Sequence, residues 1–489
     1  MVSDESALVS AVEIRGLFGN KYLHVDLAGE NRGHRGGRRL SLLYGNNGSG
    51  KTTVLKLLWH ALSPSDRGGH RSEIAKTPFE RFTIHLCSGD VISVEKIDGL
   101  VGDFRATVMS GDRRIVDQLY REIPEGKVIP VSPPLEPSSR GLHQKTLFDF
   151  EASLERAATE AAWREAIATA ELSFRRSVHE SERRPDSFVK YLKRLGTGPY
   201  MLADDRRIYG DSIDRIGQRR PRRHVEFEDN SDPQNGGGGV TAELAIALKR
   251  THDMIQKMVI NGNVSGSRGS NTVYLGILER VSLSGFADAE PVTRSDLINK
   301  LKEIADRTKE CSTYGLMPRL KEDSFLDVLN ETPDDQLRVA DAVMQPFLEA
   351  QEARLDALSS VVKLLSTLTR EVNRFFESSG KRASYTTQRG FRVTSDDGQN
   401  LQPESLSSGE RQILLLLLNT VLARQSTPLF LIDEPELSLN VKWQRQLMGA
   451  LLSLTEGASV QFVVATHSIE VITGHRDSLA KVAPRESED

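Results

Sequence analysis

The order of apolar and polar positions near the N-terminus predicts strands that lead into a helix. Residues 8 to 30 alternate as short strands do, and Arg39 to Tyr44 has the apolar character of a buried strand. A glycine-rich segment follows at once, and from Lys51 to Leu62 apolar residues recur at helical spacing. Residues 81 to 110 predict a meander of strands. The first part of the chain therefore contains a strand, a glycine loop and a helix in succession.

The middle of the chain has a mainly helical pattern. Residues 147 to 195 place apolar positions on one helical face, and Pro199 to Leu202 predicts a short strand. Residues 226 to 239 combine acids, proline and consecutive glycines, which is typical of a linker. From Asp334 to Phe376 near-heptad spacing predicts a helix of about 40 residues, which Pro346 either kinks or starts. This helix is either an amphipathic helix on its own domain or a projecting coiled-coil arm.

From Tyr385 the pattern returns to strands and then predicts an apolar helix, a strand, a second helix and a last strand that ends near Thr466. The longest apolar stretch, Ile413 to Leu418, is far shorter than the ~20 residues of a membrane span. The N-terminal segment lacks the apolar run of a signal peptide. We therefore expect no membrane association.

Composition narrows the class of protein. The 489 residues include 64 Lys+Arg and 68 Asp+Glu, so the net charge is −4, which argues against a chain that coats nucleic acid throughout. An apolar content of 38% excludes disorder of the whole chain. The two cysteines, Cys87 and Cys311, cannot form a disulfide framework, so a reducing compartment, the cytoplasm, is expected.

Residues 45 to 52, Gly-Asn-Asn-Gly-Ser-Gly-Lys-Thr, match the phosphate-binding pattern G-x-x-x-x-G-K-[ST]. Glycines let backbone N–H groups close around phosphates, and the following helix adds the partial positive charge of its N-terminus. Lys51 can reach the β- and γ-phosphates, and Thr52 can ligate Mg²⁺. The residues expected to bind the nucleotide are Asn46, Asn47, Gly48, Ser49, Gly50, Lys51, Thr52 and Thr53.

A pair of acids follows a buried strand in the C-terminal part. Pro428 to Ile432 has the composition of a parallel strand and delivers Asp433 and Glu434 to the edge of a sheet. We expect Asp433 to hold Mg²⁺ directly or through water. Glu434 is placed to polarise the water that attacks the γ-phosphate.

The segment Leu406-Ser407-Ser408-Gly409-Glu410 precedes the apolar helix and ends 23 residues before Asp433. Alone, it would be interpreted as an ordinary helix N-cap. Together with the glycine loop and the acidic pair it resembles the ATP-binding-cassette (ABC) class of ATPase, whose signature LSGGQ is matched by LSSGE. The resemblance implies that Ser407, Ser408, Gly409 and Glu410 cap the γ-phosphate of ATP on an opposing protomer, in a head-to-tail dimer.

Two further segments follow in the order of that class. Pro435 to Asn440 looks like its D-loop, although many relatives carry His where this chain has Asn440. His467 ends the last strand and matches the class histidine that contacts the γ-phosphate and the attacking water. The resemblance therefore implies Lys51, Glu434 and His467 as catalytic residues. The candidates for its glutamine loop are Gln118, Gln144 and Gln218, and those for its adenine-stacking aromatic are Phe18 and Tyr22.

The large insertion between glycine loop and signature, and the sequence DEPELSL, resemble the soluble branch of the class: RecF, OLD-type ATPases and, more distantly, SMC proteins. The implied fold is α/β, an ABC-type ATPase head with a mixed sheet and flanking helices, split by a large, mainly helical insertion. We expect the N-terminal half of the head at 1–110, the insertion at 111–379, the C-terminal half at 380–480 and a tail at 481–489.

As a stand-alone ATPase of this shape, the chain resembles the ATPases of two-gene prokaryotic antiphage systems of the Septu and PARIS types. The implied function is Mg²⁺-dependent ATP hydrolysis by a homodimer or higher homo-oligomer that switches a separate effector, an HNH or Toprim nuclease. The cofactors expected are ATP and Mg²⁺. Two alternatives stay open: a RecF-like ATP-dependent DNA clamp or loader in recombination repair, and a scaffold that hardly hydrolyses ATP.

Clustered arginines keep nucleic-acid contact open. Their guanidinium forks suit phosphates, but acids are interspersed among them, so DNA or RNA contact, protein docking and a solvated face are the alternatives. The cluster comprises Arg206, Arg207, Arg215, Arg219, Arg220, Arg222 and Arg223.

Overall fold

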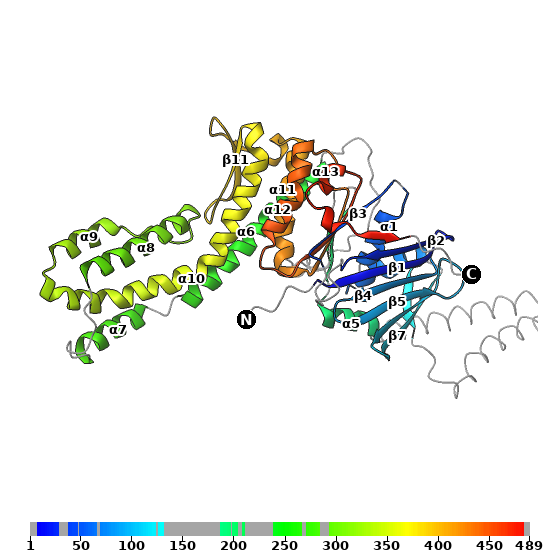
Figure 1. The fold of residues 1–489 in the computed structure, drawn as a ribbon, viewed down its shortest axis with the longest axis horizontal. Helices are drawn as coiled ribbons and strands as arrows, with labels where there is room; N and C mark the ends of the chain where they lie inside the picture. The colour runs from blue at the N-terminus through cyan, green and yellow to red at the C-terminus, as the bar shows by residue number, and fades with distance from the viewer. Residues whose placement is uncertain are drawn as a thin grey trace, which may run out of the picture. The chain divides into compact units, whose positions relative to one another are not determined.

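The computed structural model divides the chain into two compact units, whose elements are drawn in Figure 1. The sheet unit comprises Met1–Glu228, Ala423–Leu437 and Gly457–Asp489, and the helical unit comprises Asp229–Leu422 and Ser438–Glu456. The residues that the structure describes are 7–28, 38–46, 48–65, 69–123, 126–131, 186–196, 198–203, 208–210, 238–266, 270–283 and 293–483.

An antiparallel sheet, ordered β16-β2-β1-β4-β5-β6-β7-β8, forms one layer of the sheet unit (Figure 1). Alternation explains its strands: in β4, Phe82, Ile84 and Leu86 are buried and alternate with residues that are more exposed. The strands predicted within residues 8–30 and 81–110 are confirmed. The strands are β1 (Val9–Leu17), β2 (Lys21–Asp26), β4 (Arg81–Leu86), β5 (Asp90–Lys96), β6 (Phe104–Ser110), β7 (Arg113–Glu122), β8 (Val128–Val131) and β16 (Lys481–Ala483).

This sheet extends past the boundaries expected from the sequence. Residue 110 ends β6, but β7 pairs with β6 and β8 pairs with β7, so the sheet continues to Val131. At the other end of the chain, residues expected to belong to a tail form β16, which pairs with β2. The added strands join the sheet through backbone hydrogen bonds. Sequence motifs were used to place the expected boundaries, and motifs contain no information on strand pairing.

A second sheet of the same unit is mostly parallel, with the order β10-β9-β14-β15-β3. Its strands β14 (Leu429–Asp433) and β15 (Gln461–Thr466) are buried throughout, as expected for apolar runs in a parallel sheet. The register pairs Asp433 with Ala465 and Thr466 with Tyr44, so the carboxyl ends of three strands form one row. The remaining strands are β3 (Leu40–Tyr44), β9 (Tyr200–Leu202) and β10 (Ile208–Gly210).

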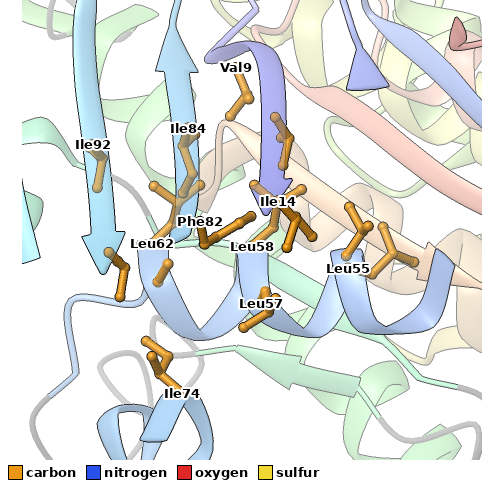
Figure 2. Close-up of a cluster of buried hydrophobic side chains, with 14 of the residues drawn as sticks. Val9, Ile14, Leu55, Leu57, Leu58, Leu62, Ile74, Phe82, Ile84 and Ile92 are labelled. Atoms are coloured by element: carbon orange, nitrogen blue, oxygen red, sulfur yellow. The ribbon is translucent and has the colours of Figure 1, made fainter. Parts of the chain in front are cut away.

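Helix α1 (Lys51–Leu62) contributes to the core of the sheet unit, and its bounds are those predicted from the sequence. Figure 2 shows Leu58 and Leu62 of this helix beside Phe82 of β4. The same cluster includes Leu431 and other residues of the parallel sheet, so α1 is buried against both sheets. Full burial of each such side chain is worth about 1.5–3 kcal/mol. Two shorter helices, α2 (His70–Lys76) and α5 (Ser187–Leu195), complete the described helices of this unit's N-terminal segment.

The helical unit is organised along α10 (Leu337–Phe376), which packs against α6, α7 and α8 (Figure 1). The predicted 40-residue helix is confirmed, but Pro346 does not start it, because the helix begins nine residues earlier. Buried leucines such as Leu348, Leu355 and Leu358 form its packed face. The neighbouring helices are α6 (Gly238–Gly266), α7 (Ser270–Leu283), α8 (Arg294–Thr313) and α9 (Glu322–Glu331).

After α10 the chain forms a small antiparallel sheet of β11 (Lys381–Thr386), β12 (Gly390–Ser395) and β13 (Asn400–Leu401). Helix α11 (Ser408–Ser426) follows and enters the sheet unit at Ala423, and α12 (Val441–Leu454) returns to the helical unit. The predicted order of strands, helix, strand, helix and last strand is therefore confirmed. No helix within the described ranges is long and apolar enough to span a bilayer.

Some sequence predictions fall outside the described residues. They are Asn47, most of the helix predicted at 147–195, the start of the linker predicted at 226–239, and the arginine cluster, namely Arg206, Arg207, Arg215, Arg219, Arg220, Arg222 and Arg223.

Candidate functional site

The glycine loop lies between β3 and the N-terminus of α1, in the sheet unit. Gly48 and Gly50 have φ values of 77° and 95°, a region that glycine enters without steric cost. A Cβ on Gly50 would lie only 3.1 Å from a methyl carbon of Leu17 and 3.2 Å from one of Leu23. The loop can therefore keep this path only with glycine at position 50.

Lys51 folds its ammonium group over the loop. Its Nζ donates hydrogen bonds to the carbonyl oxygens of Gly45 at 2.8 Å and Asn46 at 3.1 Å. Burial lowers the pKa of Lys51, and the nearby carboxylates of Glu434 and Asp433 oppose that shift. The cation and the acidic pair thus lie within electrostatic reach of one another in a single unit. Thr52 and Thr53 occupy the first turn of α1 beside it.

Asp433 and Glu434 stand at the carboxyl end of β14. Asp433 is almost completely buried, at 2% exposure. Glu434 has a φ of 46°, which costs a residue other than glycine about 1–3 kcal/mol, and its backbone N–H is held by the Ala465 carbonyl at 2.9 Å. This turn directs the two adjacent carboxylates differently, one buried and one accessible.

His467 faces Glu434 across the row of strand ends. Its Nε2 lies 3.3 Å from Glu434 Oε1, and both side chains are about 30% exposed. A histidine that donates from Nε2 can fix the orientation of this carboxylate. The structure therefore brings together the predicted residues Lys51, Asp433, Glu434 and His467 within the sheet unit.

Glu436 is a component that the motif analysis did not single out. One of its carboxylate oxygens accepts hydrogen bonds from the Thr466 hydroxyl at 2.6 Å, the His467 N–H at 2.7 Å and the Ser468 N–H at 3.1 Å. The side chain is buried. Glu436 therefore fixes the turn that carries His467. The sequence signal was its place two residues after Glu434, but only the fold shows its partners.

The signature segment lies in the helical unit, at the N-terminus of α11. The Ser407 backbone N–H donates to Glu410 Oε2 at 2.7 Å, and the Glu410 N–H donates to the Ser407 hydroxyl at 3.3 Å. These reciprocal bonds form a capping box. Lys381, at the start of β11, donates to both Glu410 oxygens at 2.8 and 2.6 Å. Burial alone would raise the pKa of Glu410, but the hydrogen bonds from Lys381 and Ser407 outweigh it and lower that pKa.

Gly409 packs against the D-loop segment within the same unit. A Cβ at this position would lie 2.8 Å from the Ser438 carbonyl oxygen and 3.3 Å from the Trp443 ring. Ser438 itself has a φ of 65°. Asn440, the departure noted in the sequence, caps α12 by accepting a hydrogen bond from the Trp443 N–H at 2.9 Å. Asn440 thus has a local role in starting that helix. Ser408 is the first residue of α11.

The remaining sequence candidates have distinct placements. Gln118 is buried and accepts hydrogen bonds from the Ser187 N–H at 3.2 Å and hydroxyl at 3.0 Å, so its amide holds the start of α5. Phe18 is half exposed, and the Lys21 ammonium lies 5.9 Å from its ring centroid. Lys21 also donates to the Gly48 carbonyl at 2.9 Å, a contact with the glycine loop that the sequence did not predict. Gln144 and Gln218 lie outside the described residues.

These residues fit a magnesium nucleotide by their donor chemistry. Mg²⁺ prefers hard oxygen ligands and is commonly held by one or two carboxylates together with substrate phosphates. The Thr52 hydroxyl and the buried Asp433 carboxylate are such donors. In the described residues no group of three or more His, Cys, Asp and Glu side chains is arranged to hold a metal by itself. The donor set therefore suits a metal that arrives with phosphate.

A protein family described as "AAA domain, putative AbiEii toxin, Type IV TA system" matches residues 309–473. The matched range contains the signature segment, Asp433, Glu434 and His467, and it excludes the glycine loop. The glycine loop and the matched segment together support a P-loop ATPase. No curated protein matches the chain.

Several solved structures show a low-level likeness. The Smc head domain of Pyrococcus furiosus, with an extended coiled coil and bound to the C-terminal domain of ScpA, is 12% identical at a TM-score of 0.37, and the likeness covers 97% of this chain and 95% of that one. The Smc head domain of Pyrococcus yayanosii is 14% identical at a TM-score of 0.34, covering 98% and 97%. The Thermotoga maritima SMC head is 17% identical at 0.20, covering 25% and 48%. Values at this level add nothing to the geometry described above.

Proposed function

We propose that this protein is a Mg²⁺-dependent ATPase whose head-to-tail dimer acts as a nucleotide-driven switch on a separate effector, a nuclease, in prokaryotic antiphage defence. The observation that carries the ATPase part is the strand register, which aligns the ends of β3, β14 and β15 and so groups Lys51, Asp433, Glu434 and His467. ATP is the substrate that the glycine loop would bind.

Each residue has a separate role in the proposed reaction. Lys51 and the N–H groups of the glycine loop hold the phosphates. Glu434 accepts the proton of the water that attacks the γ-phosphorus, while the bond from that phosphorus to the bridging oxygen of ADP breaks. His467 orients Glu434 through the 3.3 Å contact. When bound, Mg²⁺ would neutralise charge on the phosphates, with Thr52 and Asp433 as its protein ligands.

The dimer part of the proposal rests on the signature segment. The first turn of α11 presents N–H groups at Ser408 and Gly409, and a helix N-terminus favours an anion. We assign these groups to the γ-phosphate of ATP held by a second copy. ATP would then close two copies together, hydrolysis would separate them, and the helical units would carry the change to the effector.

Two substitutions test the ATPase and the dimer. Lys51→Ala should abolish ATP binding, measured by calorimetry, because the ammonium and the loop conformation that it holds are both lost. Glu434→Gln should retain ATP and accumulate a dimer, measured by light scattering after size-exclusion chromatography. Unchanged ATP affinity in the Lys51→Ala variant would refute the glycine-loop assignment. A Glu434→Gln variant that stays monomeric with ATP would refute the head-to-tail dimer.

The effector part has its own test. Where the adjacent gene encodes an HNH or Toprim nuclease, the two proteins are co-expressed and plaque formation is measured during phage challenge. Protection that is lost with Lys51→Ala or without the nuclease supports the switch. Protection that persists in the Lys51→Ala strain would contradict a nucleotide-driven role.

A further inference from the structure

An acidic residue occupies the first turn of the signature helix, and a lysine from another element is paired with it. The Glu410 side chain is 3% exposed and the Lys381 side chain 19% exposed. The Lys381 Nζ contacts both carboxylate oxygens, at 2.8 and 2.6 Å. Lys381 is the first residue of β11, which follows shortly after the end of α10 at Phe376, whereas Glu410 belongs to α11. The pair therefore joins two elements at the position where a phosphate is proposed to bind.

An unbalanced carboxylate there would oppose that phosphate. Glu410 already accepts the Ser407 N–H at 2.7 Å, so its negative charge lies within the same turn as the groups assigned to the γ-phosphate. Two like charges brought together in a protein interface disfavour association, and water screens this repulsion poorly in a buried setting. A glutamine at this position, as in LSGGQ, would carry no such charge. Among the described contacts of Glu410, the positively charged group is the ammonium of Lys381.

We infer that Lys381 is the built-in counter-ion of an acidic signature loop, cancelling the charge of Glu410 so that this loop accepts the γ-phosphate of ATP bound to a second copy. The inference rests on the proposed function, because it requires the head-to-tail dimer. Lys381 is a positioning residue: it acts through Glu410 and does not itself touch the phosphate. A purely structural salt bridge would instead fix β11 to α11 with no influence on nucleotide-driven assembly.

Neutralising substitutions separate the two roles. In the Glu434→Gln background, Lys381→Met removes the cation, and Lys381→Gln removes the charge but keeps a hydrogen-bond donor for Glu410, which protects folding. Lys381→Met combined with Glu410→Gln removes both charges, and buried pairs replaced by neutral groups are commonly tolerated. Lys363→Met is the matched control, because Lys363 lies in the same unit and pairs only loosely with Glu456, at 3.5 Å in an exposed setting.

The measurements are ATP affinity by calorimetry, the dimer dissociation constant with ATP by analytical ultracentrifugation, and thermal unfolding. Both single Lys381 variants should keep ATP affinity, because the glycine loop belongs to the other unit, and should weaken the ATP-bound dimer by about 10-fold or more. The double variant should restore the dimer to within about threefold of the Lys363→Met control. A dimer affinity that follows the charge on Glu410 while the unfolding temperature stays near that of the control distinguishes the counter-ion role, because loss of a structural salt bridge changes both quantities together.

The outcomes are distinguishable. If the Glu434→Gln parent and the Lys363→Met control do not dimerise with ATP, the proposed function fails and this inference falls with it. If they dimerise and folded Lys381→Gln dimerises equally well, the counter-ion role alone is overturned. The counter-ion role is also overturned if the folded double variant dimerises with ATP no more tightly than Lys381→Met. If Lys381→Met does not fold, the comparison is made with Lys381→Gln.

Discussion

The backbone N–H of His467 donates a 2.7 Å hydrogen bond to the carboxylate of Glu436. That carboxylate also holds Thr466 and Ser468, so one buried acid fixes the whole turn after β15. Since His467 contacts Glu434 from this turn, the distance between the two proposed catalytic groups depends on a third residue, Glu436, which holds the backbone of His467.

Glu436→Ala should therefore impair turnover more than nucleotide binding. Loss of hydrogen bonds to a charged group should cost about 1.5–3 kcal/mol of unfolding free energy and lower kcat by about 10-fold as the His467 turn loosens. Urea unfolding and steady-state ATPase assays measure the two effects. Glu456→Ala is the control, because Glu456 is exposed and should change neither. An unchanged kcat in Glu436→Ala would argue against the positioning role.

His467→Ala should lower kcat by about 100-fold, within the range of a group that assists proton transfer, and should leave ATP affinity nearly unchanged. His475 is the matched control, since it follows shortly after in the same segment and has no described contact with the acidic pair. His475→Ala should keep most of the activity. Equal losses in both variants would show that the effect comes from folding of the segment rather than from the Glu434 contact.

Gly409→Ala should disrupt the packing between the signature turn and the D-loop. The added methyl would lie 2.8 Å from the Ser438 carbonyl, and overpacking of this kind costs about 1–3 kcal/mol. ATP-dependent dimerisation should weaken as well. Gly449→Ala in α12 provides the opposite case: nothing lies within 4 Å of its Cβ position, so it should stabilise the helix by about 0.5–1 kcal/mol. Thermal unfolding of both variants checks the signs.

Lys96 gives the sheet unit a pH dependence. Burial lowers the pKa of Lys96 to about 8 from an ordinary 10.5, with a small opposing effect from Glu122. Between those two pH values the unfolded chain binds more protons than the folded one, so unfolding free energy rises with pH over this window. The difference in stability between wild type and Lys96→Met should therefore shift in favour of wild type from pH 8 to 10.5. A difference that stays flat across this window would refute the shift.

The neutral amine keeps its structural role in that window. Lys96 Nζ donates to the carbonyl oxygens of Ile74 at 2.8 Å and Ala75 at 2.6 Å, near the end of α2. An uncharged amine retains two N–H donors, so these bonds survive deprotonation. The predicted rise in unfolding free energy with pH therefore comes from the loss of a buried charge and not from new hydrogen bonds.

The local part of this fold was predictable from sequence because it depends on short-range patterns. The bounds of α1, the strand before Asp433 and the long helix up to Phe376 follow from apolar spacing and from the glycine loop. The pairing of β7 and β8 with the first sheet did not follow, since pairing depends on partners remote in sequence.

The same division applies to the candidate site. The side chains of Lys51, Asp433, Glu434 and His467 have chemistry that suggests a nucleotide site. The order of their motifs along the sequence predicted that they act together. Glu436 and Lys381 are acidic and basic residues of ordinary appearance whose roles come from hydrogen bonds to Thr466 and Glu410, respectively. No spacing rule encodes those contacts, so they become visible only when strand ends and helix termini are placed in space.

The pairing of β3 with β15 joins two strands that lie far apart in the sequence, since Leu42 pairs with Val464. In the described part of this sheet, β15 is the strand that pairs with β3, so β3 stays unpaired there until this distant segment of the chain joins it. Such a long-range closure is slow, and it leaves an apolar strand edge open to aggregation or chaperone capture in the meantime. Nucleotide binding should therefore appear late during refolding, only after β3 has paired with β15.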